Sequence, residues 1–117
     1  MRKLNTAINK KINEILPDVP VYPAIADADA AMPYVVYTDE SFTVDRTKDG
    51  IFSQIHNVTI DIWTEKFDEG DEMADILLAN MEYVISPGIE SYITSGNWGY
   101  EDGSYRQTLN FEIEVDV

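Results

Sequence analysis

The sequence predicts an α+β domain, with a mainly antiparallel sheet of four to five strands and two helices packed on one face. Two stretches repeat apolar residues at helical spacing, and several others alternate apolar and polar residues as half-buried strands do. Turn signals between neighbouring strands favour antiparallel pairing, and both helices need an apolar sheet face to cover. With 117 residues, 44% of them hydrophobic, the chain has the size and composition of a single domain spanning residues 1–117.

The first helix is expected over residues 3–16. Its apolar residues fall on one arc of a helical wheel: Leu4, Ile8, Ile12, Ile15 and Leu16. Pro17 ends the helix, because proline has no backbone N–H to continue it. Residues 17–33 contain four prolines and are predicted to be an extended loop that crosses the body of the domain.

Two strands are expected next. Residues 33–38 are rich in aromatic and β-branched side chains, and residues 56–64 alternate with Val58, Ile60 and Ile62 on one side. The polar stretch Thr43–Gly50 lies between them, and Asp49-Gly50 is a strong turn signal. The sequence therefore predicts a hairpin.

The second helix is expected from about Asp71 to Ile85, where Pro87-Gly88 stops it. Acidic residues precede it and complement the positive end of its dipole. Residues 89–95 have the pattern of a strand. We expect a flexible connection over Gly96–Gly103, which holds Trp98 and Tyr100, and a last strand over residues 109–117, where apolar and polar residues alternate strictly.

The chain is strongly acidic, with a net charge of −14. This charge excludes nucleic-acid binding through a basic stripe and electrostatic attachment to an anionic membrane. The first sixteen residues differ, since they hold four basic residues and only one acid, Glu14, which leaves −17 on the rest of the chain. Such asymmetry favours contacts between copies of the chain through complementary surfaces.

Cysteine is absent, which excludes a disulfide framework, a zinc–thiolate site and a cysteine nucleophile. The longest apolar runs have four residues, far below the ~20 needed to cross a bilayer. Polar residues also interrupt any signal-peptide pattern at the start of the chain. We expect a soluble protein of a cytoplasm-like compartment, with no membrane partner.

No catalytic, cofactor-binding or metal-ligating residue is predicted, and we expect that the protein is not an enzyme. His56 is the single histidine, and its place at the start of a strand favours a structural role at a sheet edge or an interface. No serine lies in a nucleophile elbow and no phosphate-binding loop is present. The acids at positions 68, 69, 71 and 72 lack the spacing of a calcium loop and are typical of a helix N-terminus.

Two groups of side chains are candidates for a subunit interface. Trp63 lies on the polar side of its strand, where it forms a subunit contact or is covered by a loop of its own chain. The acids of the last strand, Glu112, Glu114 and Asp116, point the same way. Cations from a neighbouring copy, Lys3, Lys10 and Lys11, are suited to neutralise them. Alternatively, the acidic stripe lines a solvent channel.

Four segments carry a resemblance to a known family. These are Pro33-Tyr34-Val35-Val36-Tyr37, Asp45-Arg46-Thr47-Lys48-Asp49-Gly50, Val58-Thr59-Ile60-Asp61-Ile62-Trp63-Thr64-Glu65, and Phe67-Asp68-Glu69 leading into a helix. In this order they resemble the tail-completion or tail-terminator-like proteins of long-tailed phages and prophages. The resemblance covers about residues 3–85, and the rest fits only through its last strand.

The resemblance implies a homohexameric ring that caps the tail tube, ends tail growth and joins tail to head. Its partners would be the tail-tube protein and a head-completion or connector protein, and DNA would pass without specific binding. The protein would be assembled in the host cytoplasm and reside in the virion. Gly50 would supply backbone freedom in a hairpin, and Asp61 and Trp63 would lie near the open face of the sheet.

Contacts with the tube or the head connector are expected in two loops, at Arg46, Lys48 and Asp49 and at Trp98 and Tyr100. Two other classes remain open at this stage. One is another head–tail connector component, such as a head-closure or adaptor protein. The other is a small non-viral α+β domain that binds a ligand or regulates.

Overall fold

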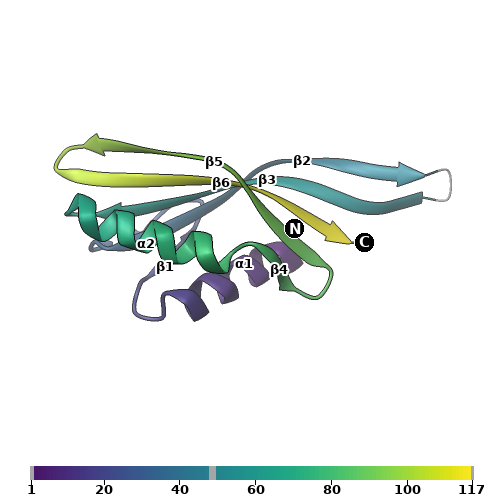
Figure 1. The fold of residues 1–117 in the computed structure, drawn as a ribbon, viewed down its shortest axis with the longest axis horizontal. Coiled ribbons are helices and arrows are strands. Elements are labelled where there is room, and N and C mark those ends of the chain that lie inside the picture. Colours follow the sequence, from purple (N-terminus) through teal and green to yellow (C-terminus); the bar gives the residue numbers. More distant parts are fainter. Residues whose placement is uncertain (1, 48–49, 117) are drawn as a thin grey trace.

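Six strands and two helices make up the part of the chain that the computed structural model describes, residues 2–47 and 50–116. In chain order they are α1 (Arg2–Ile15), β1 (Val21–Pro23), β2 (Tyr34–Thr47), β3 (Gly50–Thr64), α2 (Phe67–Asn80), β4 (Tyr83–Ser86), β5 (Ile89–Glu101) and β6 (Ser104–Asp116). The strands form one sheet in the order β1-β2-β3-β6-β5-β4. Both helices lie on the same side of this sheet (Figure 1).

The α+β class is confirmed, but the predicted sheet of four to five strands is wrong in number. The sheet has six strands and is mixed, because β1 pairs with β2 in parallel while the other neighbours are antiparallel. The two additional strands are the short edges β1 and β4. β1 lies in the proline-rich segment and ends at Pro23, which an edge strand tolerates because its outer side needs no ladder hydrogen bond.

The core lies between the two helices and one face of the sheet. The predicted apolar side of α1 is buried there, and the alternating residues of β3 and β6 supply the sheet side of the core. The largest fully buried apolar side chains are Leu4, Ile8, Ile12, Ile60, Ile62, Leu77, Met81, Ile89, Phe111 and Ile113. We call the sheet face that the two helices cover the helix face, and the opposite sheet face the open face.

The β2–β3 hairpin is longer than predicted. The polar stretch 43–50 is not a connection, because β2 continues to Thr47 and β3 begins at Gly50. The backbones of β2 and β3 pair along the whole hairpin, and β3 also pairs with β6 from Ser53 onward. This pairing places polar residues in strands. Gly50 has a φ of 128°, which confirms the predicted need for glycine at this position.

The second helix begins and ends earlier than predicted, at Phe67 and Asn80 instead of Asp71 and Ile85. Asp68 and Glu69 occupy its first turn. Tyr83 has a positive φ of 64°, which turns the chain out of the helix and into β4. The apolar run that favoured a longer helix therefore divides between two elements, and Val84 is exposed.

The expected flexible connection over Gly96–Gly103 is also wrong. β5 continues through this stretch to Glu101, and a two-residue turn joins it to β6. Asp102 and Gly103 have φ values of 49° and 82°, the pattern of a type I′ hairpin turn. Asp102-Gly103 is thus a hairpin signal of the same kind as the one used at Asp49-Gly50.

The molecule is elongated, with extents of 52 × 27 × 23 Å. The β2–β3 and β5–β6 hairpins point in opposite directions along the long axis (Figure 1). The helices cover only the middle and one end of the sheet, so that the far half of β2–β3 extends beyond them (Figure 1). Residues 41–46 of this arm are exposed.

Candidate interaction surfaces

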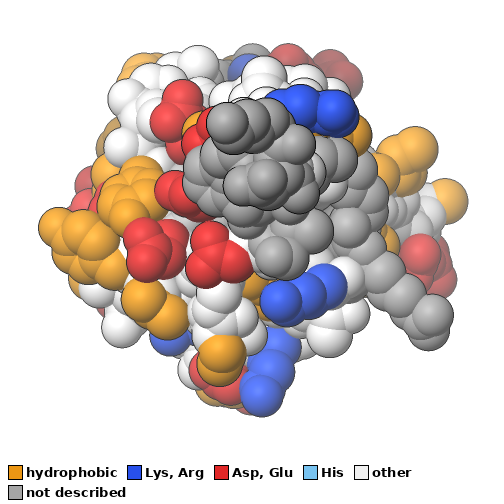
Figure 2. Space-filling model, turned by 90° about the vertical axis from the view of Figure 1, so that its right-hand side faces the viewer, with side chains coloured by type: hydrophobic (Ala, Val, Ile, Leu, Met, Phe, Trp, Pro, Cys, Tyr) orange, Lys and Arg blue, Asp and Glu red, His pale blue; other side chains and the backbone are white. Residues whose placement is uncertain are grey.

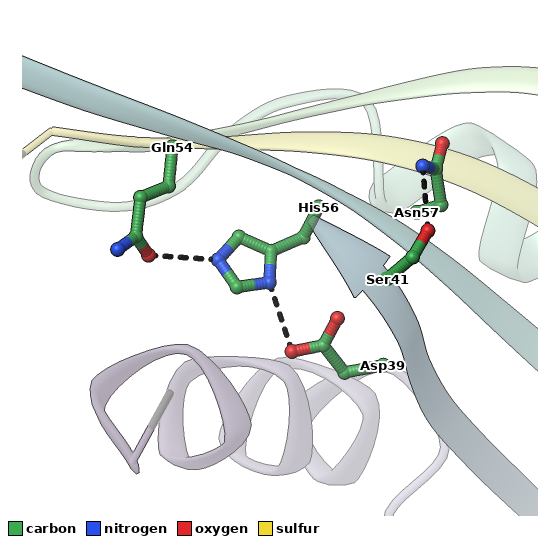
Figure 3. A network of polar contacts seen from close by, with 5 residues as sticks. All are labelled: Asp39, Ser41, Gln54, His56 and Asn57. Carbon is green, nitrogen blue, oxygen red and sulfur yellow. Dashed lines mark hydrogen bonds and ion pairs between the residues drawn. The ribbon is translucent and has the colours of Figure 1, made fainter. Parts of the chain in front are cut away.

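His56 is a buried structural group. Its ring is fully buried, with Nδ1 2.8 Å from Oδ2 of Asp39 and Nε2 3.0 Å from Oε1 of Gln54 (Figure 3). The Phe42 ring stacks on it, with 5.2 Å between centroids. His56 lies in the middle of β3, an interior strand, so the expected position at a strand start and a sheet edge is wrong. The start was misjudged because β3 extends back to Gly50.

The open face of the sheet is polar and hydrogen-bonded across its strands. The Thr59 hydroxyl lies 2.8 Å from a carboxylate oxygen of Glu40 and 3.2 Å from the amide oxygen of Asn110. The Asn110 amide donates to the Ser95 hydroxyl at 3.1 Å. The Thr108 hydroxyl donates to Asp61 at 2.6 Å, which places Asp61 on this face as the resemblance implied. The face has the polar, mutually satisfied character of a surface in contact with water.

Trp63 lies at one end of the open face. Its ring stacks on Tyr34 at 6.3 Å, and the Arg106 guanidinium lies 5.9 Å from its centre. A hollow of about 370 Å³ beside Trp63 is lined by residues 24–27 and by Asp61. A loop of the same chain therefore borders the indole, and the ring is half-buried. Arg106 also pairs with Glu101 at 3.3 Å.

Aromatic side chains gather on the helix face at the end of the β5–β6 hairpin. We call Phe67, Trp98, Tyr100 and Tyr105 the aromatic tip. The Phe67 ring lies 5.3 Å from Trp98 and 5.8 Å from Tyr105, and Tyr100 lies 4.9 Å from Tyr105. Trp98 and Tyr100 remain 59% and 58% exposed. Large exposed aromatic rings of this kind are typical of protein–protein contacts.

The two predicted loop contacts therefore lie on different hairpins. Trp98 and Tyr100 are together at the aromatic tip, whereas Arg46 is exposed on the β2–β3 arm at the other end of the molecule. Lys48 and Asp49 lie outside the described residues. Figure 2 looks onto the arm end and shows acidic, basic and hydrophobic side chains side by side.

The basic candidates all lie on α1. Lys3 and Lys10 are exposed, and Lys11 is half-buried. Lys10 lies between two surface hollows of about 730 and 610 Å³, which it lines together with Thr6. The first of these also contains the Asn5, Asn9 and Asn13 amides. This side of α1 is a polar, basic, hollowed surface.

The acidic candidates lie along the far half of β6. Glu112 and Asp116 are exposed and Glu114 is half-buried. Lys3 and Asp116 of the same chain both border Gly88. Nζ of Lys3 lies 3.8 Å, and Oδ2 of Asp116 lies 3.9 Å, from the position that a Cβ at Gly88 would occupy. The acidic stripe thus has a cation of its own chain nearby at one end.

Glu90 extends the acidic stripe onto β5, where it lies directly opposite Glu114. The Tyr92 hydroxyl donates a hydrogen bond to the Glu90 carboxylate. This hydrogen bond, together with partial burial and the charges of Glu90 and Glu114, raises the pKa of Tyr92 to about 12. Sequence reasoning missed Glu90 and Tyr92, although their pairing with β6 follows from the Asp102-Gly103 turn.

Within residues 2–47 and 50–116, no group of three or more acidic or histidine side chains is arranged to hold a metal ion. Neither helix of the described chain is long and apolar enough to cross a membrane.

Comparison with known proteins gave a likeness in fold. No protein-family model and no curated protein matches the chain. Among solved structures, a chain from the virion of a native gene transfer agent (GTA) particle is similar, with a TM-score of 0.71 and 19% sequence identity. The match covers 91% of this chain and 84% of that one. The protein therefore has the fold of a chain found in a gene transfer agent virion.

Proposed function

We propose that the protein is a structural subunit of a phage-like particle, and that six copies form a ring that caps the tail tube, ends its growth and joins the tail to the head. The observation that carries the proposal is the fold likeness to a chain of a gene transfer agent virion, at a TM-score of 0.71 over nearly the whole chain. The order of motifs over residues 3–85, which resembles tail-terminator-like proteins, supports the same role. In this role the chain has no catalytic task.

The charge of the chain suits a DNA conduit. Each subunit carries −14, and the open face has an acidic stripe of Glu90, Glu112, Glu114 and Asp116. A ring that turns such a surface inward would repel phosphates, so that DNA slides through without adsorbing.

The two hairpins suit a subunit with several neighbours. They extend to opposite ends of a 52 Å molecule, and each bears exposed apolar side chains. The aromatic tip is our candidate for contact with a neighbouring protein of the particle, since exposed Trp and Tyr rings are the residues that most often dominate binding energy. Assembly takes place in the host cytoplasm, and the finished ring is part of the virion.

Mass in solution is the first test. Light scattering behind size exclusion, across protein concentration, should detect a species of six times 13.3 kDa that grows with concentration. Gold-labelled protein is then added to cognate tail tubes and viewed by negative stain. We expect one label cluster at one tube end.

Three results would contradict the proposal. Labelling along the tube wall would indicate a tube subunit, and binding to heads but not tubes would indicate a head-closure or adaptor protein. A strict monomer that ignores both would indicate a non-viral domain. The double variant Trp98→Ser, Tyr100→Ser removes both exposed rings of the aromatic tip and should bind tube ends less than the unaltered protein does.

A further inference from the structure

Half of β2 and half of β5 have an outer edge without a partner strand in the described chain. β1 pairs with β2 only over Val21–Pro23 against residues 35–37. β4 pairs with β5 only over residues 89–91, and a Glu82 carboxylate oxygen accepts the N–H of Ile93 at 2.8 Å. Beyond these points, residues 38–46 of β2 and 94–101 of β5 present unpaired backbone groups. We call them the β2 free edge and the β5 free edge.

The β5 free edge lacks the usual protection of an edge strand. Natural edge strands are blunted by lysine, proline or a covering element, because unpaired N–H and C=O groups recruit other strands. Residues 94–101 contain no proline and no basic residue, and Glu101 is their only charge. All of them except Gly99 are exposed. Such an edge is suited to strand addition.

The two free edges are matched in direction and position. β2, β3, β6 and β5 are successive antiparallel neighbours, so β2 and β5 run in opposite directions. They lie near opposite edges of the sheet, and their free halves are at opposite ends of the long axis (Figure 1). Two copies in the same orientation, shifted along this axis, therefore bring one β2 free edge beside the other β5 free edge as an antiparallel pair.

The exposed apolar side chains of the two free edges lie on the same face. Phe42 and Val44 face the helix side, because they stand opposite His56 and Gln54 of β3. Trp98 and Tyr100 also face the helix side, where Trp98 packs against Phe67 and Tyr100 against Tyr105. Their exposed fractions are 44%, 38%, 59% and 58%, in that order. Pairing the edges would bury these four side chains against one another.

We propose that the β2 free edge of one copy adds to the β5 free edge of the next, so that the sheet continues from subunit to subunit. This inference deepens the proposed ring and rests on it. The contact is heterologous, because different surfaces of the two copies meet, and such a contact forms a ring when the rotation between successive copies closes. The register that puts Phe42 opposite Trp98 also puts Val44 beside Gly96 and Thr43 opposite Asn97.

Disulfide trapping tests this register, since the chain has no native cysteine. Thr43 and Asn97 are exposed on the open face, and directly paired residues bring Cα atoms to about 4.5–5.5 Å, within disulfide reach. Thr43→Cys and mass-tagged Asn97→Cys proteins are mixed under mild oxidation. We expect a yield of mixed dimer at least several-fold higher than when tagged Asp75→Cys protein replaces the Asn97→Cys protein. Asp75 is a suitable control because it is exposed but lies on α2, away from the paired edges.

A second pair of variants tests the apolar contact. Phe42→Ser and Trp98→Ser should each abolish the high-mass species while leaving the circular dichroism spectrum unchanged. Asn80→Ser, at an exposed position near the end of α2 that belongs to neither free edge, should leave the mass unchanged.

The outcomes separate this inference from the proposed function. Rings of six subunits that give no excess of the mixed disulfide would overturn edge pairing and leave the ring intact. Abundant mixed disulfide in a protein that never binds tube ends would support edge pairing and contradict the terminator role. A monomer at all concentrations, with control-level disulfide, would overturn edge pairing, while binding at tube ends would still test the function.

Discussion

Oδ2 of Asp39 lies 2.8 Å from Nδ1 of the buried His56, across the two strands that form the protruding arm. Gln54 holds the other ring nitrogen at 3.0 Å, and Phe42 stacks on the ring. These side chains lie beside the shift in β2–β3 pairing register between Asp39 and Ser41, where the arm leaves the body of the sheet. This polar contact pairs both nitrogens of the buried imidazole and links the two strands of the arm, because an unpaired buried imidazole would be costly.

We therefore predict that His56→Ala destabilises the protein by about 2–4 kcal/mol, through the lost side-chain volume and the orphaned Asp39 carboxylate. Asp39→Asn should cost less, since it keeps the shape of the contact. Urea unfolding measures both. Ser41→Ala, which removes an exposed hydrogen bond to Asn57, is the matched control. A loss for His56→Ala no larger than that for the control would contradict a stabilising role.

Gly70→Ala is predicted to destabilise the protein although alanine is the better helix former. A Cβ at this position would stand 2.8 Å from Oγ1 of the buried Thr64, which donates to the carbonyl of Lys66 at 2.8 Å. The helix gain of up to about 1 kcal/mol is outweighed by an overpacking cost of about 1–3 kcal/mol.

A double-mutant cycle isolates this contact between α2 and β3. Thr64→Ala removes the crowding atom, so the Gly70→Ala cost should shrink in the double variant. Thermal unfolding of the four proteins measures the coupling. Strict additivity of the two changes would show that Thr64 does not limit the approach of the helix.

Tyr92 is predicted to lose its proton at a pH above the ordinary range of a tyrosine. Its pKa of about 12, against an ordinary value of 10.0, follows from the hydrogen bond to Glu90 and the nearby acidic charges. The folded state thus holds this proton more tightly than the unfolded state, so the contribution to stability is full below pH 10 and is lost toward pH 12. Tyrosinate absorbance during an alkaline titration measures it.

Two variants identify the late step of that titration. Tyr92→Phe should remove it, and Glu90→Gln should move it to lower pH. Tyr22→Phe, at a half-buried tyrosine of the edge strand β1, is the control and should leave the late step in place. A late step that survives Tyr92→Phe would assign it to a different tyrosine.

Lys10→Glu is predicted to weaken the assembly at low salt. Lys10 is exposed on the hollowed side of α1, and an acidic neighbouring copy would be attracted to it. Lys66→Glu makes the same charge change at an exposed site before α2 and serves as the control. Sedimentation at low and high salt should show a loss of mass for Lys10→Glu alone, and the difference should vanish at high salt. Equal behaviour of the two variants would contradict a role for the α1 charge.

The local sequence pattern was sufficient to predict the elements whose apolar residues repeat at the period of a helix or a strand. The apolar arc of Leu4, Ile8 and Ile12 predicts α1, and it is buried as expected. The alternation of Val58, Ile60 and Ile62, and that of the last strand, predicts which side chains enter the core. The requirement for glycine at position 50 also follows from the sequence, since a turn there needs a positive φ.

Pairing with distant strands decided the rest. Residues 43–46 and 96–101 are polar or glycine-rich, so no local pattern indicates strands, yet backbone hydrogen bonds to β3 and β6 make them so. The same tertiary contacts bury His56 between Asp39 and Gln54, end α2 before Tyr83, and bring Trp98 and Tyr100 together with Phe67. Composition alone determined that the chain is acidic and free of cysteine, whereas the free edges exist only because neighbouring strands end before β2 and β5 do. Side-chain periodicity reports burial on one face, but strand pairing is a long-range backbone property that it does not encode.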